Sequence, residues 1–295
     1  MRLRALAPAK INLALFLGPV REDGRHELVT VFESISLADE LVLETLDAWP
    51  AADEVVCPGV TEPNLVTRAL SELRARGWDG PQVRIEIDKR IPVAAGLGGG
   101  SADAAAAMRL AVELAPGRPE EVMDVAACLG ADVPSQVLPG VSVGTGAGEI
   151  VEPFGPLVPH GVLVLPAGVE LSTPEVYREA DRLELPRPMA ALRERYQDLI
   201  GGLESGRLAR GLVVNDLGPA ALKLCPSIAS ALGAARAAGA DHALVCGSGP
   251  TVAGLFWGAD GAERAADAAQ SLSEDFAGAV AAQPVGAEFG LPVFA

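Results

Sequence analysis

Apolar and polar residues alternate with a period of two in several parts of the chain. The alternation runs through residues 11–15 and returns at residues 83–88, where three aliphatic side chains are interleaved with charged ones. This period is typical of strands with one buried face. Residues 1–46 are therefore expected to be rich in β-structure, as several short strands with a turn at residues 21–24.

Other segments have the composition of helices. We expect helices at residues 65–76, 102–114, 119–129, 175–183, 189–196, 227–238 and 261–272. Further strands are expected at 162–165, 242–246 and 251–257, with a strand–turn–strand unit within 137–150. The elements are mixed without a regular βαβ order, which favours an α+β fold in two lobes. A segment with three prolines, residues 153–159, is the expected connection, giving domains at 1–155 and 156–295.

Composition excludes several classes of protein. The chain has 295 residues, 49% hydrophobic residues and a net charge of −16, so it is globular and repels nucleic acid and anionic membranes. Four scattered cysteines and three histidines do not form a disulfide or zinc framework. The apolar N-terminal stretch is interrupted by Pro8, Lys10 and Asn12, so we expect neither a signal peptide nor a membrane span there. We therefore expect a cytoplasmic protein.

The most informative segment is a glycine-rich loop, PVAAGLGGGSADAAAA, at residues 92–107. Its four glycines free the backbone to direct N–H groups toward the positive end of the following helix, for which Ser101 is the expected N-cap. The loop fits neither a P-loop, which needs a lysine after the glycines, nor the dinucleotide fingerprint G-x-G-x-x-G. A turn without a ligand is the alternative, although four glycines cost roughly 0.5–1 kcal/mol each relative to alanine. The loop therefore predicts a phosphate cradle.

Four other features are candidates for chemistry. Asp132 in LGADVP is placed to act as a base or as an ordinary turn residue, and Lys10 lies within an alternating strand. Only three of the 23 basic residues are lysine, which makes a retained lysine more informative. His26 is either a ligand contact or a structural residue, and Gly-Ser-Gly-Pro at 247–250 is either a tight hairpin or a second loop that closes over a ligand.

Together these features resemble the GHMP kinases. Three motifs occur in the order of that family: PAKINL at residues 8–13, the glycine loop, and GSGPT at residues 247–251. The resemblance implies two α+β lobes, the first like ribosomal protein S5 domain 2 and the second ferredoxin-like. It also implies ATP and Mg²⁺ as cofactors and a small-molecule alcohol as substrate. Monomer and homodimer both stay open.

Further motifs narrow the resemblance to one branch of the family. HELVTVFESISLADEL, LGADVP, STPEVY and NDL are similar to the branch that phosphorylates the 2-hydroxyl of a cytidine-diphosphate-linked methylerythritol (CDP-methylerythritol) in non-mevalonate isoprenoid biosynthesis. The alternatives are another GHMP kinase, of the mevalonate or homoserine type, and a nucleotide-binding protein without catalysis.

The resemblance also assigns roles to residues. Asp132 is implied as the base that takes the hydroxyl proton, and Lys10 as the cation that keeps it ionised and stabilises the transferred phosphoryl group. The implied nucleotide contacts are Asn64, Lys89, Pro92, Ala94, Ala95, Gly96, Leu97, Gly98, Gly99, Gly100 and Ser101. The implied substrate contacts are Asn12, Arg25, His26, Thr173, Tyr177, Gly247, Ser248 and Gly249. Which residue contacts the metal stays open.

The chain departs from the pattern of the family at two places. Arg25 stands where the family usually has a tyrosine that stacks on cytosine, and Ser135 and Gln136 stand where it has apolar or aromatic residues. A guanidinium can also stack on a base. The departures therefore bear on the substrate and not on the kinase chemistry.

Overall fold

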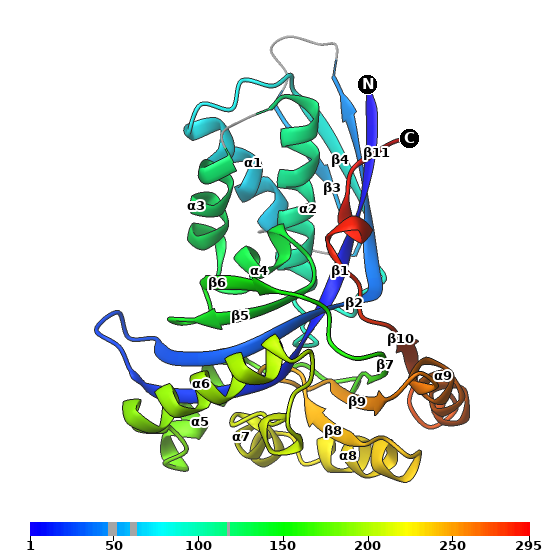
Figure 1. Cartoon of the computed structure of the whole chain (residues 1–295). Coiled ribbons are helices and arrows are strands. Elements are labelled where there is room, and N and C mark those ends of the chain that lie inside the picture. Colours follow the sequence, from blue (N-terminus) through cyan, green and yellow to red (C-terminus); the bar gives the residue numbers. More distant parts are fainter. Residues whose placement is uncertain (47–51, 60–63, 117–118) are drawn as a thin grey trace.

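The computed structural model describes residues 1–46, 52–59, 64–116 and 119–295. Its larger sheet has seven strands in the described part of the chain, and β1 and β2 form its centre (Figure 1). The strands are β1 (Arg2–Val20), β2 (His26–Thr45), β3 (Glu54–Val56), β4 (Val83–Asp88), β5 (Val141–Thr145), β6 (Ile150–Phe154) and β11 (Val293–Phe294). The order is β11-β1-β2-β4-β3, and β5 pairs with β2 and β6.

The first two strands form one long antiparallel hairpin. The predicted turn at residues 21–24 is present, but the prediction of several short strands is wrong. The register shifts between Pro8 and Ala9, between Asn12 and Ala14, and between Leu17 and Val20. Each irregularity resets which side chains face the core, so one long strand has the sequence pattern of several short ones.

Four helices accompany this sheet: α1 (Leu65–Ala75), α2 (Gly99–Leu114), α3 (Pro119–Leu129) and α4 (Val133–Val137). Helix α2 lies between α1 and the sheet (Figure 1), and its alanines at positions 102 and 104–107 are fully buried. Small side chains let the helix backbone approach its neighbours closely. The glycine loop at the start of α2 is thereby fixed against the sheet.

The second sheet has the order β10-β7-β9-β8 and lies below the first in Figure 1, with the remaining helices beside it and along the β1–β2 hairpin. Its strands are β7 (His160–Leu165), β8 (His242–Val245), β9 (Val252–Trp257) and β10 (Val280–Ala282). The helices are α5 (Thr173–Arg182), α6 (Met189–Glu204), α7 (Gly218–Leu224), α8 (Ile228–Ala237) and α9 (Gly261–Leu272), with 3-10 turns η1 (Arg210–Leu212) and η2 (Ala287–Gly290). The chain then returns to the first sheet as β11, which pairs with β1.

Most predicted elements are present with boundaries shifted by a few residues. The N-cap prediction is wrong: α2 starts at Gly99, its N-cap is Gly98 with φ 71°, and Ser101 lies inside the helix. Helices α4 and α7 are not predicted from the sequence, and the predicted helix at 189–196 covers only the first half of α6. The domain boundary at residue 155 stays a prediction. Within the described residues, no helix is long and apolar enough to cross a membrane.

Candidate active site

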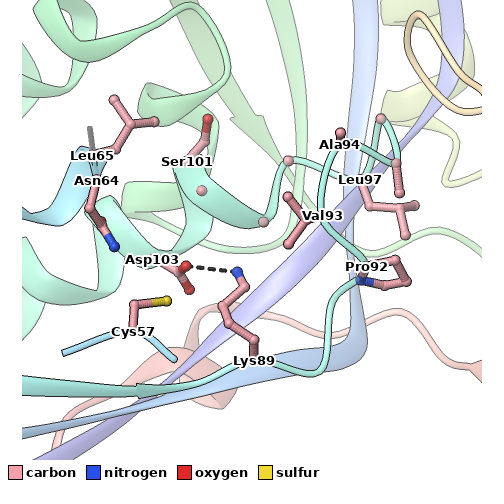
Figure 2. Close-up of a pocket in the computed structure, with 15 residues that line it drawn as sticks. Cys57, Asn64, Leu65, Lys89, Pro92, Val93, Ala94, Leu97, Ser101 and Asp103 are labelled. Carbon is pink, nitrogen blue, oxygen red and sulfur yellow. Dashed lines mark hydrogen bonds and ion pairs between the residues drawn. The ribbon is translucent and has the colours of Figure 1, made fainter. Parts of the chain in front are cut away.

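Two cavities meet at the glycine loop. One, of about 340 Å³, is lined by the loop together with Asn64 and Lys89 (Figure 2). The other, of about 270 Å³, contains Lys10 and Asp132. Gly96, Gly98 and Ser101 line both cavities, which we call the nucleotide cavity and the acceptor cavity. The loop therefore stands between two compartments that open onto the same backbone.

Close packing explains two of the loop glycines. Gly96 has φ 78°, and a Cβ atom there would lie 2.3 Å from the carbonyl oxygen of Cys246. A Cβ atom on Gly98 would lie 2.9 Å from Cγ of Lys10. The loop thus rests on the strand that carries Lys10 and on the loop that follows β8. These contacts bring together the three motifs that are far apart in the sequence.

The start of α2 supplies donors for an anion. The first N–H groups of a helix have no partner within it, and the helix dipole adds positive charge there. In α2 these groups belong to the glycine loop, at the junction of the two cavities. Ala94 adopts φ 54°, in the left-handed region that residues other than glycine rarely enter. The loop backbone can therefore surround a phosphate group without a side-chain charge.

Lys10 and Asp132 form the charged centre of the acceptor cavity. Lys10 Nζ lies 3.2 Å from Asp132 Oδ2, with the lysine side chain 4% exposed and the aspartate side chain 39% exposed. Lys10 Nζ also donates to Asn12 Oδ1 at 2.9 Å, and Asn12 donates to Thr30 at 2.7 Å. Asp132 precedes α4 but makes no capping hydrogen bond. The buried amide and hydroxyl thus fix the ammonium, while the carboxylate stays open to the cavity.

A second lysine organises the nucleotide cavity. Lys89 Nζ contacts the buried carboxylate of Asp39 and donates to Asp103 Oδ2 at 2.8 Å (Figure 2). Burial raises the pKa of Asp103 to about 7, against the opposing effect of Lys89. Burial alone would lower the pKa of Lys89, but the two carboxylates outweigh it and hold it above its ordinary value. Asn64 lies beside this cluster and caps α1 by accepting from the Val66 N–H at 2.8 Å.

Helix α5 closes the acceptor cavity from the second lobe. Thr173 and Ser248 are joined through their hydroxyl groups at 2.8 Å, which links the start of α5 to the loop after β8. Tyr177 lines the same cavity, and burial, reinforced by the Asp132 carboxylate, raises the pKa of its phenol. The phenol therefore stays protonated and presents a neutral aromatic face.

Not every predicted contact lines these cavities. All eleven predicted nucleotide contacts line the nucleotide cavity, and Lys10, Asn12, Asp132, Thr173, Tyr177, Gly247 and Ser248 line the acceptor cavity. The structure does not place Arg25, His26 or Gly249 on either lining. For Gly249 the reason is its place at the back of the loop, where a Cβ atom would meet Val245 at 2.8 Å.

Arg25 and His26 have other partners. The Arg25 guanidinium donates to Asp23 at 2.8 Å, within the turn between β1 and β2, because an acidic side chain stands two residues away. His26 Nδ1 donates to the Gly18 carbonyl at 2.9 Å, and its ring lies 5.4 Å from that of Tyr177. In this structure His26 therefore contacts the ring of Tyr177 without lining the cavity.

Several residues that line the cavities are not predicted from the sequence. Asp103 lines the nucleotide cavity beside Cys57, and Thr30 and Phe32 line the acceptor cavity. A single acidic residue within the alanine-rich segment after Ser101 was a sequence signal that could have identified Asp103. Thr30 and Phe32 carried no such signal, because an alternating strand does not reveal which of its faces borders a cavity.

The chain is similar in sequence and in fold to known kinases. The GHMP kinases N terminal domain model matches residues 64–140, and the GHMP kinases C terminal model matches residues 199–275. A 4-diphosphocytidyl-2-C-methyl-D-erythritol kinase of Corynebacterium efficiens is 44% identical, covering 94% of this chain and 91% of the relative. A crystal structure of 4-(cytidine 5'-diphospho)-2C-methyl-D-erythritol kinase is 36% identical, with a TM-score of 0.73 over 96% of this chain and 99% of that one.

A more distant neighbour shares only the fold. Homoserine kinase from Cytophaga hutchinsonii is 17% identical, with a TM-score of 0.69 over 99% of this chain and 97% of that one. The two-lobed α+β architecture is therefore common to kinases whose names differ, and sequence identity separates the groups. The chain belongs to the GHMP kinase family, in the group of the 4-diphosphocytidyl-2-C-methyl-D-erythritol kinases.

Proposed function

We propose that this protein transfers the γ-phosphoryl group of ATP to the 2-hydroxyl of 4-diphosphocytidyl-2-C-methyl-D-erythritol. The observation that carries the proposal is the Lys10–Asp132 pair, which lies in the acceptor cavity next to the glycine loop. Relatives over 40% identical along most of the chain bear the name of this kinase. A module that only bound nucleotide would need neither the ammonium nor the carboxylate.

The roles of the charged residues follow from what phosphoryl transfer requires. Asp132 takes the proton of the substrate hydroxyl as its oxygen forms a bond to the γ-phosphorus, and the bond from that phosphorus to the bridging oxygen of ADP breaks. Lys10 stabilises the carboxylate before transfer and the phosphoryl oxygens during it. The N–H groups at the start of α2 hold the phosphates in place.

The donor set fits a magnesium ion that arrives with the nucleotide. Among the described residues, no group of three or more His, Cys, Asp or Glu side chains could hold a metal ion. Mg²⁺ in phosphoryl-transfer sites binds mainly phosphate oxygens and water, with only one or two protein oxygens. Ser101 lines both cavities and could supply one such oxygen. The ion would neutralise phosphate charge.

The pyrimidine end of the substrate is assigned to α5. Tyr177 offers an aromatic face in the acceptor cavity, and Thr173 and Ser248 offer hydroxyl groups at its rim. His26 acts through Tyr177 in this proposal, and Arg25 stays in its turn. The cytoplasmic location and the choice between monomer and homodimer stay predictions.

Release of ADP by the purified protein tests the proposal. With Mg-ATP, we expect ADP only when 4-diphosphocytidyl-2-C-methyl-D-erythritol is added, and none with homoserine or mevalonate. Turnover of homoserine or mevalonate alone would contradict the assigned substrate. ATP binding without ADP release on any member of the panel would contradict the kinase assignment itself.

A further inference from the structure

One arginine joins the three elements that carry the active site. Arg109 belongs to α2, the helix that begins with the glycine loop, and α4 packs against this helix (Figure 1). Its Nη2 donates to the Leu6 carbonyl of β1 at 2.9 Å, and its Nη1 donates to the Gln136 carbonyl of α4. Lys10 lies on β1, and Asp132 immediately precedes α4. The guanidinium therefore connects the elements that carry the phosphate donors, the ammonium and the base.

The partners of Arg109 are backbone groups. Its third bond runs from Nε to the Gly290 carbonyl at 2.9 Å, and within the described residues it forms no ion pair with a carboxylate. Burial lowers the pKa of the guanidinium to about 10, and no charged neighbour offsets this effect. The group still carries its charge at neutral pH, and its N–H donors point in fixed directions within one plane. An arginine bonded only to carbonyl groups holds backbone segments in place and does not neutralise charge.

Two side chains of α4 complete its attachment. Gln136 Nε2 donates to the Pro8 carbonyl at 3.1 Å, two residues before Lys10, and Ser135 Oγ donates to the Asp132 carbonyl at 2.8 Å. Both side chains are buried, and neither lines a cavity of the active site. The departure from the family pattern at these two positions therefore bears on the attachment of α4 and not on a cavity wall.

The open edge of β1 explains why side chains bond to it. Among the described residues, β11 pairs with β1 only at Leu3 and Arg4. A buried backbone carbonyl beyond that point needs another donor, and α2 and α4 supply one each. The Lys10 N–H then donates to the Leu97 carbonyl of the glycine loop at 2.9 Å. The strand is thus fastened along the residues that lead to Lys10.

We propose that Arg109 and Gln136 are positioning residues for the phosphoryl transfer, an inference that rests on the proposed function. They hold α4 against β1 and so fix the 3.2 Å separation between Lys10 Nζ and Asp132 Oδ2. The Asp132 side chain is 39% exposed and makes no capping bond, so its position depends on the backbone of α4. Neither positioning residue lines a cavity of the active site, and each acts through the segments that it holds.

Kinetics of two variants test the proposal. Arg109→Met keeps most of the side-chain length and removes its donors, and Gln136→Leu removes the amide. We expect each to lower kcat about 10- to 100-fold, because a displacement of about 1 Å in a catalytic group has an effect of that order. The Kd for ATP, measured by calorimetry, should be unchanged. Unchanged kcat in both variants, or a loss of ATP affinity that matches the loss of kcat, would overturn the proposal.

A third variant separates positioning from stability. Leu110→Ala removes a fully buried side chain from the same helix, so it should lower stability without changing kcat. A loss of kcat in Leu110→Ala as large as that in Arg109→Met would show that the effect is merely structural. Gln136→Leu carries the same expectation, and decides the comparison if Arg109→Met does not fold.

Hydrogen exchange tests the attachment without any substrate. In Arg109→Met, the amides of α4 and of Lys10 should exchange at least about tenfold faster than in the wild type, whereas those of α8 in the second lobe should keep their rates. Equal acceleration throughout the chain, or none at α4, would contradict the proposal. A wild type that releases no ADP with any alcohol would contradict the proposed function instead, and the exchange rates would still decide whether these side chains hold α4.

Discussion

Alanine substitutions at three glycines of the phosphate loop separate three physical effects. At Gly96, with φ 78°, the added Cβ atom would lie 2.3 Å from the backbone oxygen of Cys246. At Gly98, with φ 71°, it would lie 2.9 Å from the aliphatic part of Lys10. At Gly100, inside α2 and without a positive φ, it would make only an ordinary contact at 3.6 Å.

The expected changes in the free energy of unfolding follow from these contacts. A residue other than glycine in the left-handed region costs about 1–2 kcal/mol. Gly96→Ala adds overpacking against backbone, about 1–3 kcal/mol, and is expected to lose about 2–5 kcal/mol in all. Gly98→Ala meets the side-chain Cγ of Lys10 instead of backbone, so we expect a loss of at least about 1–2 kcal/mol. Gly100→Ala should gain about 0.5–1 kcal/mol, because alanine is the better helix former.

Urea denaturation of the three variants measures this order directly. Gly98→Ala should also lower kcat by about 100-fold, because a shift of about 1 Å in a catalytic group costs that much. The kcat of this variant therefore reports on Lys10 separately from stability. A Gly98→Ala variant as stable as the wild type, or a Gly100→Ala variant that loses more stability than Gly96→Ala, would refute the reasoning.

Three further predictions concern single residues. Asp132→Asn should lower kcat by at least about 100-fold while calorimetry finds nucleotide affinity unchanged, and a fully active variant would exclude Asp132 as the base. Tyr177→Ala should raise KM for the cytidine substrate at least about fivefold and Tyr177→Phe should not, because stacking on a base contributes about 1–3 kcal/mol; equal KM values would remove Tyr177 from the pyrimidine site. Burial raises the pKa of Asp103 to about 7, so the folded protein keeps a proton that the unfolded chain releases near pH 4. The contribution of Asp103 to the free energy of unfolding therefore falls as the pH rises from about 4 to about 7. Asp103→Asn removes it, so the stability of the variant relative to wild type should rise across that range, and parallel pH profiles in urea denaturation would contradict the pKa assignment.

Local patterns were enough to predict the elements and the phosphate loop. The hairpin of β8 and β9 and helices α3 and α9 were predicted because apolar spacing, glycines and prolines mark their limits. The loop was predicted because clustered glycines before an alanine-rich helix have few structural alternatives. In these places the relevant physics acts over a few residues.

Short helices and contacts between residues far apart in the sequence could not be predicted from local patterns. Helices α4 and α7, of five and seven residues, are too short to show a helical period. Asp39 joins Lys89 across 50 positions and Glu33 joins His160 across 127, and no local pattern marks such pairs. Arg25 was predicted to contact the cytosine of the substrate because the resemblance gives that role to its position. In the structure its guanidinium is instead bonded to the nearby carboxylate of Asp23.

The glycines of the two loops have a second physical role beside phosphate binding. Lys10 is bonded to the glycine loop through its own backbone, where its N–H donates to the Leu97 carbonyl at 2.9 Å. A Cβ atom on Gly98 would strike the shaft of Lys10, and one on Gly247 would lie 3.4 Å from Nζ. Glycines from two loops therefore leave room around one buried ammonium. The glycine loop supplies backbone donors to an anion. Because its glycines have no side chains, they also leave room for Lys10 to reach Asp132 from another strand. The lysine that a P-loop carries within its own sequence is therefore provided here by β1.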